Sequence, residues 1–128
     1  PEMKIGMIPG SGGSARLAKM IGISRTKNII MRGKRLSGEE AFQLGIACEV
    51  VEKSELENMT KKIVKELLGV SPLAQRTIKS VLNATQNSTL HTSIDLEGEA
   101  YGRLRSSNDF KEGVKSFSEK RPPSYKGN

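Results

Sequence analysis

The sequence predicts a mostly α-helical chain, and three observations lead to this prediction. From residue 54 onward, apolar residues recur at the three- and four-residue spacing of amphipathic helices. Ser or Thr precedes several of these segments, where its side-chain oxygen can accept from a free N–H group of the first turn. Glycines stand where segments end. Two short apolar stretches, residues 4–8 and 46–51, lack this periodicity, and we expect both to be extended.

The chain opens with a short apolar segment and a glycine-dense loop. Residues 4–8 are predicted to form a short strand or extended segment, which Pro9 ends. The loop 10–14 holds three glycines, which can reach positive φ and approach a ligand closely. Ser14 is the expected N-cap of the following helix, and Gly22 is placed to end it.

Two more short helices are expected before residue 52. The first runs through about residues 26–31. The second begins with a capping box, in which Ser37 is the N-cap and Glu40 stands three residues later. It is expected to stop at Gly45.

Beyond this point four amphipathic helices are expected, which begin near residues 54, 71, 89 and 108. Ser71 followed by Pro72 is an N-cap with proline at the first helical position. The pair Pro122-Pro123 forbids further helix. We therefore divide the chain into residues 1–52, with the glycine-rich loop, and residues 53–128, a helical region.

The chain has few aromatic residues with which to complete a hydrophobic core by itself. The chain has 128 residues, of which 35% are hydrophobic, with three Phe, two Tyr and no Trp. Either the domain is a small helical one, or another segment or subunit covers much of its apolar surface. We favour the second alternative. The start at Pro1, without a methionine, is expected of a piece of a longer protein.

The net charge of +7 narrows the choice of partners. From residue 101 onward, seven Lys and Arg residues stand against three acids. Such a region attracts phosphate-bearing molecules, nucleic acid or acidic membranes, or it is simply a solvated basic surface. No nucleic-acid-reading motif accompanies the charge, and no apolar stretch is long enough to span a bilayer. Nucleic acid and membrane are therefore disfavoured as partners.

Cysteine usage indicates a reducing compartment. Cys48 is the only cysteine, so no internal disulfide can form. Its apolar neighbours predict a small buried side chain. We expect a cytoplasmic protein, or one of the mitochondrial matrix in a eukaryote.

One carboxylate is a candidate for chemistry. Glu2 lies beside the apolar segment and the glycine loop, where a raised pKa would suit a general acid or base. By itself, a glutamate at this place is usually a solvated surface charge. The glycine loop lacks the Gly-Lys-Ser/Thr ending of a phosphate-binding P-loop. No Cys/His cluster has metal-ligand spacing, so no metal is expected.

Three ordered blocks together resemble the enoyl-CoA hydratase/isomerase (crotonase) superfamily. Residues 1–17 contain Pro-Glu, then Gly-Met-Ile-Pro-Gly-Ser-Gly-Gly-Ser, then Arg-Leu. Residues 32–51 resemble the family's Gly-x-x-Ile/Leu-x-Ala…Ala-x-x-x-Gly-Leu-Val segment. Residues 108–123 resemble its closing Asp-x-x-Glu-Gly…Phe-x-Glu-Lys-Arg-x-Pro pattern. The resemblance covers the whole chain, and three blocks in order are more specific than any one of them.

The resemblance implies a fold and an assembly. Family members are a spiral of ββα turns followed by a helical C-terminal region that mediates trimerisation. This chain would then be the last turn of the spiral, residues 1–52, plus the helical oligomerisation region, residues 53–128. The expected self-association is a trimer or a dimer of trimers, and the first part of the enzyme would be absent.

The resemblance also implies roles for particular residues. Glu2 matches the second of two catalytic glutamates, and the loop with Pro9 and Gly10 matches a segment that lines the same pocket. Lys120 matches a position that reaches coenzyme A phosphates. Tyr101 falls where a family aromatic can line the coenzyme A or acyl pocket of a neighbouring subunit, although its spacing fits core packing equally well.

The implied activity is that of an enoyl-CoA hydratase, which adds water to a 2-enoyl-CoA. Coenzyme A would then be part of the substrate, and no separate cofactor is expected. The same glutamate is compatible with a Δ3,Δ2-enoyl-CoA isomerase or another acyl-CoA hydrolase or lyase of the family. An alternative of another class is a non-catalytic trimerisation module. The backbone N–H groups that hold the thioester oxygen lie, by the family pattern, outside these residues, so the chain alone is expected to be inactive.

Overall fold

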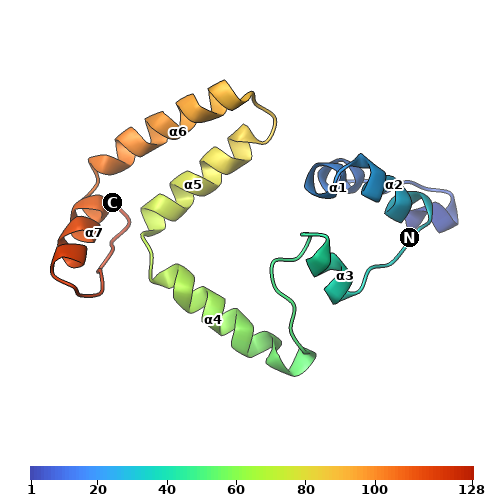
Figure 1. Cartoon of the computed structure of the whole chain (residues 1–128), viewed down its shortest axis with the longest axis horizontal. Coiled ribbons are helices and arrows are strands. Elements are labelled where there is room, and N and C mark those ends of the chain that lie inside the picture. Colours follow the sequence, from blue (N-terminus) through green and yellow to red (C-terminus); the bar gives the residue numbers. More distant parts are fainter. The chain divides into compact units, whose positions relative to one another are not determined.

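The computed structural model describes all residues, 1–128, and the chain divides into two compact units, Pro1–Leu56 and Glu57–Asn128. Every regular element in both units is a helix, as the cartoon in Figure 1 shows. The prediction of a mostly α-helical chain is therefore confirmed.

The first unit is built around two short helices in tandem. After the 3₁₀ turn η1 (Glu2–Ile5), helix α1 (Gly13–Ile21) packs against α2 (Ile23–Met31), and α3 (Gly38–Gln43) and the 3₁₀ turn η2 (Lys53–Glu55) follow. Gly22, with a φ of 82°, makes the abrupt change of direction between α1 and α2. Ile21 from α1 and Ile29 from α2 are the buried apolar residues of this unit.

Of the short strand or extended segment expected over residues 4–8, no strand forms. Residues 2–5 form the 3₁₀ turn instead, and the apolar side chains that follow it are exposed, Met7 by 61% and Ile8 by 70%. A strand requires a neighbouring strand to complete its backbone hydrogen bonds, and none of the 128 residues provides one. Residues 46–51 likewise form no regular element. Cys48 lies in this unpaired stretch and is exposed, so the prediction that it is buried is wrong.

The observed starts and ends of the helices agree better with those predicted from the sequence. The capping box is present: Ser37 Oγ accepts from the Glu40 N–H at 3.1 Å, and Glu40 Oε2 accepts from the Ser37 N–H at 2.9 Å. Gly45 follows α3 with a φ of 73°, as a helix-ending glycine should. Helix α1 begins two residues earlier than expected, because Gly12 and not Ser14 takes the N-cap position. The Ser14 hydroxyl donates to the Pro9 carbonyl instead.

The second unit contains the four longer helices. They are α4 (Leu56–Leu68), α5 (Pro72–Thr85), α6 (Leu90–Arg105) and α7 (Asn108–Ser118). Figure 1 shows α5 and α6 as a hairpin of two helices lying side by side, with α7 packed at the end of α6. Ser71 caps α5 as predicted, and Thr89 and Ser107 cap α6 and α7.

Much apolar surface is uncovered in both units. Ala100 is the one buried apolar residue of the second unit, whereas Leu68 on α4 is 80% exposed and Phe117 on α7 is 88% exposed. This agrees with the thin aromatic supply of the sequence. That another segment or subunit covers these faces stays a prediction.

Substitution of Ser71 tests the cap of α5. Its hydroxyl accepts from the Ala74 N–H at 3.1 Å and donates to an Asp109 carboxylate oxygen at 2.6 Å. We expect Ser71→Ala to lower the free energy of unfolding by about 1 kcal/mol through the lost cap alone. Ser71→Thr, which keeps the hydroxyl, is the control. Urea denaturation of both variants measures the difference, and equal stabilities would contradict the assignment.

Candidate functional site

The glycine-rich loop of the first unit contains backbone conformations that residues other than glycine rarely adopt. Ser11 and Gly12 both have positive φ, 54° and 79°, and the Gly13 N–H donates to the Gly10 carbonyl at 3.1 Å. Arg16 braces this loop, because its Nη2 donates to the Ser11 carbonyl at 2.7 Å. A Cβ on Gly12 would lie 2.9 Å from Arg16 Nη1, so a larger residue at position 12 would displace the end of the Arg16 side chain.

Beside the loop lies a small cleft of about 250 Å³. Glu2 and Pro9 both line it, and Leu17 of α1 with Ile29 and Ile30 of α2 supply apolar walls. Gly10 is next to Pro9 in the loop but is not among the lining residues. The structure thus brings Glu2 and Pro9 to one apolar cleft.

The charge state of Glu2 differs from the expectation. Its Oε2 lies 3.0 Å from the Pro1 nitrogen, and 44% of the side chain is exposed. The pKa of Glu2 is lowered from its ordinary value by a hydrogen bond from its own backbone N–H and by the terminal ammonium of Pro1. The raised pKa expected from apolar neighbours is therefore not found, because this carboxylate is half-exposed and faces a cation.

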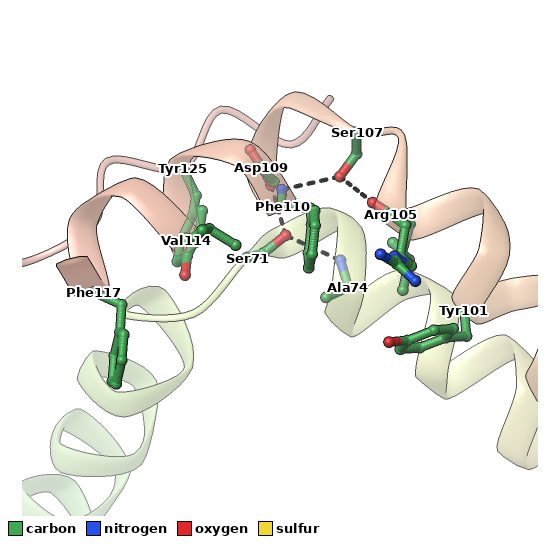
Figure 2. A pocket seen from close by; sticks show the side chains of 12 residues that line it. Ser71, Ala74, Tyr101, Arg105, Ser107, Asp109, Phe110, Val114, Phe117 and Tyr125 are labelled. Atoms are coloured by element: carbon green, nitrogen blue, oxygen red, sulfur yellow. Dashed lines mark hydrogen bonds between the residues drawn. The ribbon is translucent and has the colours of Figure 1, made fainter.

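The second unit contains a larger groove of about 540 Å³, drawn in Figure 2. Tyr101 of α6 forms one end of its wall, and the guanidinium carbon of Arg105 lies 5.9 Å from the centre of the Tyr101 ring, a cation–π distance. Other lining residues are mostly apolar: Ala74, Leu104, Phe110, Val114, Phe117 and Tyr125.

Tyr101 also lines a neighbouring groove of about 400 Å³ between α5 and α6. With 62% of its surface exposed, Tyr101 is not part of a closed core in this chain. Lys120 lines neither groove, so the structure does not bring these two predicted residues of the second unit together.

Asp109 is a buried carboxylate of this unit, and no structural role for it is predicted from the sequence. It is 4% exposed. Its carboxylate accepts from the Ser71 hydroxyl at 2.6 Å and from the backbone N–H groups of Lys126 and Gly127 at 2.9 and 3.0 Å. The Asp109 N–H donates in turn to the Asn128 carbonyl at 3.0 Å. Asp109 therefore fastens the C-terminal segment to the starts of α5 and α7.

Desolvation raises the pKa of Asp109, but hydrogen bonds from Ser71 and from the backbone of residues 126–128 outweigh it. The net result is a pKa below the ordinary value of 3.8. No signal in the sequence pairs Asp109 with Ser71, since 38 residues separate them.

A second carboxylate holds the turn that follows α7. Glu112 accepts two hydrogen bonds from Arg121, at 2.6 and 3.0 Å, and one from the Ser124 N–H at 2.8 Å. The Arg121 guanidinium, followed by the Ser124 N–H, lowers the pKa of Glu112 from 4.5 to about 2. Arg121 Nε also donates to Glu119 at 2.6 Å. These three side chains, Glu112, Glu119 and Arg121, form what we term the turn triad.

Lys120 lies within this turn and is exposed. Its φ is 52°, so the backbone is left-handed at a residue other than glycine. Its ammonium has no hydrogen-bond or ion-pair partner in the chain, in contrast to its neighbours Glu119 and Arg121.

The comparisons with known proteins agree with this arrangement of motifs. The sequence profile described as enoyl-CoA hydratase/isomerase matches residues 1–128. The chain belongs to this family. Within the enoyl-CoA hydratase/isomerase family, the mostly helical chain matches the C-terminal half of the fold.

A solved enoyl-CoA hydratase from Bacillus anthracis superposes with a TM-score of 0.96 at 35% identity, over 99% of this chain and 49% of that one. The short-chain-enoyl-CoA hydratase of Clostridium acetobutylicum is 33% identical over 94% of this chain and 46% of that protein. The mitochondrial methylglutaconyl-CoA hydratase of Mus musculus is 35% identical over 98% of this chain and 41% of that protein. The chain spans about half the length of the relatives that it matches.

Two further observations concern partners that the sequence disfavoured. No helix combines the length and the apolar character that crossing a bilayer requires. No three His, Cys, Asp or Glu side chains gather as a metal ion would need.

Proposed function

We propose that this chain supplies part of the active site of an enoyl-CoA hydratase. The observation that carries the proposal is the meeting of Glu2 and Pro9 in one apolar cleft, in a chain that belongs to the enoyl-CoA hydratase/isomerase family. The relatives from Clostridium acetobutylicum and Mus musculus are both named as hydratases of CoA thioesters, at nearly equal identity to this chain. They differ in substrate, so similarity favours the reaction class and does not choose the acyl group.

In the proposed reaction, water adds across the C2–C3 double bond of a 2-enoyl-CoA. The water oxygen bonds to C3 as the C2–C3 π bond breaks, and one proton of the water goes to a base while the other stays on the new hydroxyl. An acid delivers a proton to C2 on the same face. Glu2 is the proposed proton donor or acceptor. The cleft suits this role because its apolar walls, Leu17, Ile29 and Ile30, can exclude water around an acyl chain.

Glu2 would need a higher pKa for this role than it has here. The Pro1 ammonium is one of two causes of the lowered pKa, and a peptide bond at that nitrogen would remove it. Substrate in the cleft would also displace water from the carboxylate. Both changes move the pKa of Glu2 upward, toward the value that proton transfer near neutral pH requires.

The second unit would hold the coenzyme A portion. Lys120 offers an exposed ammonium without a partner to a phosphate, and Tyr101 offers an exposed ring beside an apolar groove. Coenzyme A enters as part of the substrate, so no separate cofactor is proposed. The backbone donors for the thioester oxygen are expected outside these 128 residues, so we propose that the chain alone is inactive.

A second proposed role is assembly, which the exposed apolar faces of α4, α6 and α7 favour. On this proposal the second unit self-associates as a trimer or a dimer of trimers. Sedimentation of the chain tests it: a species of three or six copies is expected, and a stable monomer would contradict it.

A hybrid enzyme tests the catalytic proposal. Residues 1–128 replace the matching half of the Bacillus anthracis enoyl-CoA hydratase, and the hybrid is assayed with crotonyl-CoA. We expect 3-hydroxybutyryl-CoA, observed by NMR. A folded hybrid that shifts the double bond of a 3-enoyl-CoA without adding water would favour the isomerase instead, and one that cleaves the thioester would favour a hydrolase.

A further inference from the structure

Helix α7 ends in a backbone conformation that its sequence disfavours. Lys120 directly follows the C-cap residue Glu119 and has a φ of 52°. Helices commonly place glycine at this position, because a Cβ makes the left-handed region unfavourable. A lysine here carries a conformational cost that glycine would avoid, so surrounding contacts must hold it.

The backbone contacts at this turn form a complete helix-ending motif. The Lys120 N–H donates to the Phe117 carbonyl at 3.2 Å, and the Arg121 N–H donates to the Ser116 carbonyl at 3.1 Å. This is the pair of hydrogen bonds of a Schellman turn. The geometry is thus the ordinary one for a helix end, and only the residue type at position 120 is unusual.

The side chains on either side of Lys120 are tied to α7. Arg121 donates one hydrogen bond to Glu119 at 2.6 Å and two hydrogen bonds to Glu112, which lies within α7. Such paired guanidinium–carboxylate contacts are strong and directional. Lys120 is left as the one cation of the turn whose charge is directed to solvent.

We infer that Glu112 and Arg121 are positioning residues, which hold Lys120 in its left-handed turn and so present its ammonium to a phosphate of the CoA thioester. This inference rests on the phosphate contact proposed above for Lys120. A preorganised ammonium binds an anion more tightly than a mobile one, because less side-chain and backbone freedom is lost on binding. The closing family motif would then serve substrate binding through the geometry of its turn.

An experiment without ligand tests whether Glu112 and Arg121 hold Lys120 in its left-handed turn. In the 128-residue chain, we expect Glu112→Gln to speed amide hydrogen exchange at Lys120 and Arg121, while the amides of α5 stay as in the wild type. Lys120→Gly should raise the melting temperature and Lys120→Ala should not, because only glycine relieves the left-handed strain. Unchanged exchange in Glu112→Gln would overturn the inference.

A double-mutant cycle tests the link to phosphate. Coenzyme A is titrated calorimetrically into the hybrid enzyme and its variants. We expect Lys120→Ala to weaken binding about tenfold, as for the loss of a charged hydrogen bond, and Glu112→Gln to weaken it by a smaller factor. Added to Lys120→Ala, Glu112→Gln should cost nothing further, because it acts through Lys120. Lys79→Ala on α5, which removes an exposed charge elsewhere, is the control and should bind as the wild type does.

The results of this cycle distinguish a failure of the positioning role of Glu112 from a failure of the phosphate contact of Lys120. Equal weakening by Glu112→Gln with and without Lys120 would mean a general structural role, and would overturn the inference while the phosphate contact stands. Wild-type affinity in Lys120→Ala would contradict the proposed phosphate contact itself, and the inference with it.

Discussion

Glu2→Gln is expected to lower the rate of crotonyl-CoA hydration by the hybrid enzyme about 10²- to 10⁴-fold, the usual contribution of a positioned general acid or base. Glutamine keeps the size and the polarity of the side chain but cannot exchange a proton. The apolar walls around Glu2, Leu17 and Ile29, are unchanged in the variant. The loss should therefore come from chemistry and not from a collapsed cleft.

The matched control is Glu49→Gln, which removes an exposed carboxylate of the same unit away from the cleft. We expect it to hydrate crotonyl-CoA at the wild-type rate. Initial rates at saturating substrate measure both variants. Near-normal turnover in Glu2→Gln would remove Glu2 from the mechanism, whatever Glu49→Gln does.

The second large effect is expected at low pH, where protonation should weaken the hydrogen bonds of the turn triad and of Asp109. The pKa of Glu112 is about 2 in the folded chain, against an ordinary 4.5. A carboxylate whose pKa is lowered by folding stabilises the fold above pH 4.5, and this stabilisation is lost as the pH falls toward 2. Asp109, whose pKa is also lowered, acts in the same direction. Below pH 4.5 we therefore expect residues 121–128 to detach from α7 and α5 before the helices unfold.

Carboxyl-carbon NMR during an acid titration measures the Glu112 midpoint, and the amides of Lys126 and Gly127 report release of the C-terminal segment. Between these pH values, the unfolded chain should bind about one proton more than the folded chain through Glu112 alone. Glu112→Gln should abolish that difference. A Glu112 midpoint near 4.5 would contradict the bidentate pairing with Arg121.

Features set by neighbouring residues could be predicted from the sequence. The Ser37–Glu40 capping box, the Ser71 cap and the end of α3 at Gly45 each depend on side chains and backbone within a few positions. The three family blocks, read in order, led to the family that the profile match identifies.

Features that depend on distant residues could not be predicted. The strand expected over residues 4–8 failed because local β preference does not supply a pairing partner. Asp109 looks like an ordinary acid in a first helical turn, yet its partners lie 17 and 38 residues away. The cleft could be predicted only in part: Glu2 and Pro9 are near in sequence, but the walls from α2 are not.

Lys120 is a residue whose features could be predicted from the sequence only in part. Its place in the family motif suggests a contact with phosphate, but nothing in the residue type predicts a left-handed backbone. That conformation follows from the Schellman turn and from the turn triad, which only the folded chain brings together. The structure thus adds a reason why the residues around Lys120 are charged.

We propose that Glu2 moves a proton in the reaction and that Lys120 binds the CoA thioester. Steady-state kinetics of the hybrid enzyme with crotonyl-CoA test this proposal most directly. We predict that Glu2→Gln lowers kcat with little change in KM, and that Lys120→Ala raises KM about tenfold with little change in kcat. Wild-type kcat in Glu2→Gln, or wild-type KM in Lys120→Ala, would contradict it.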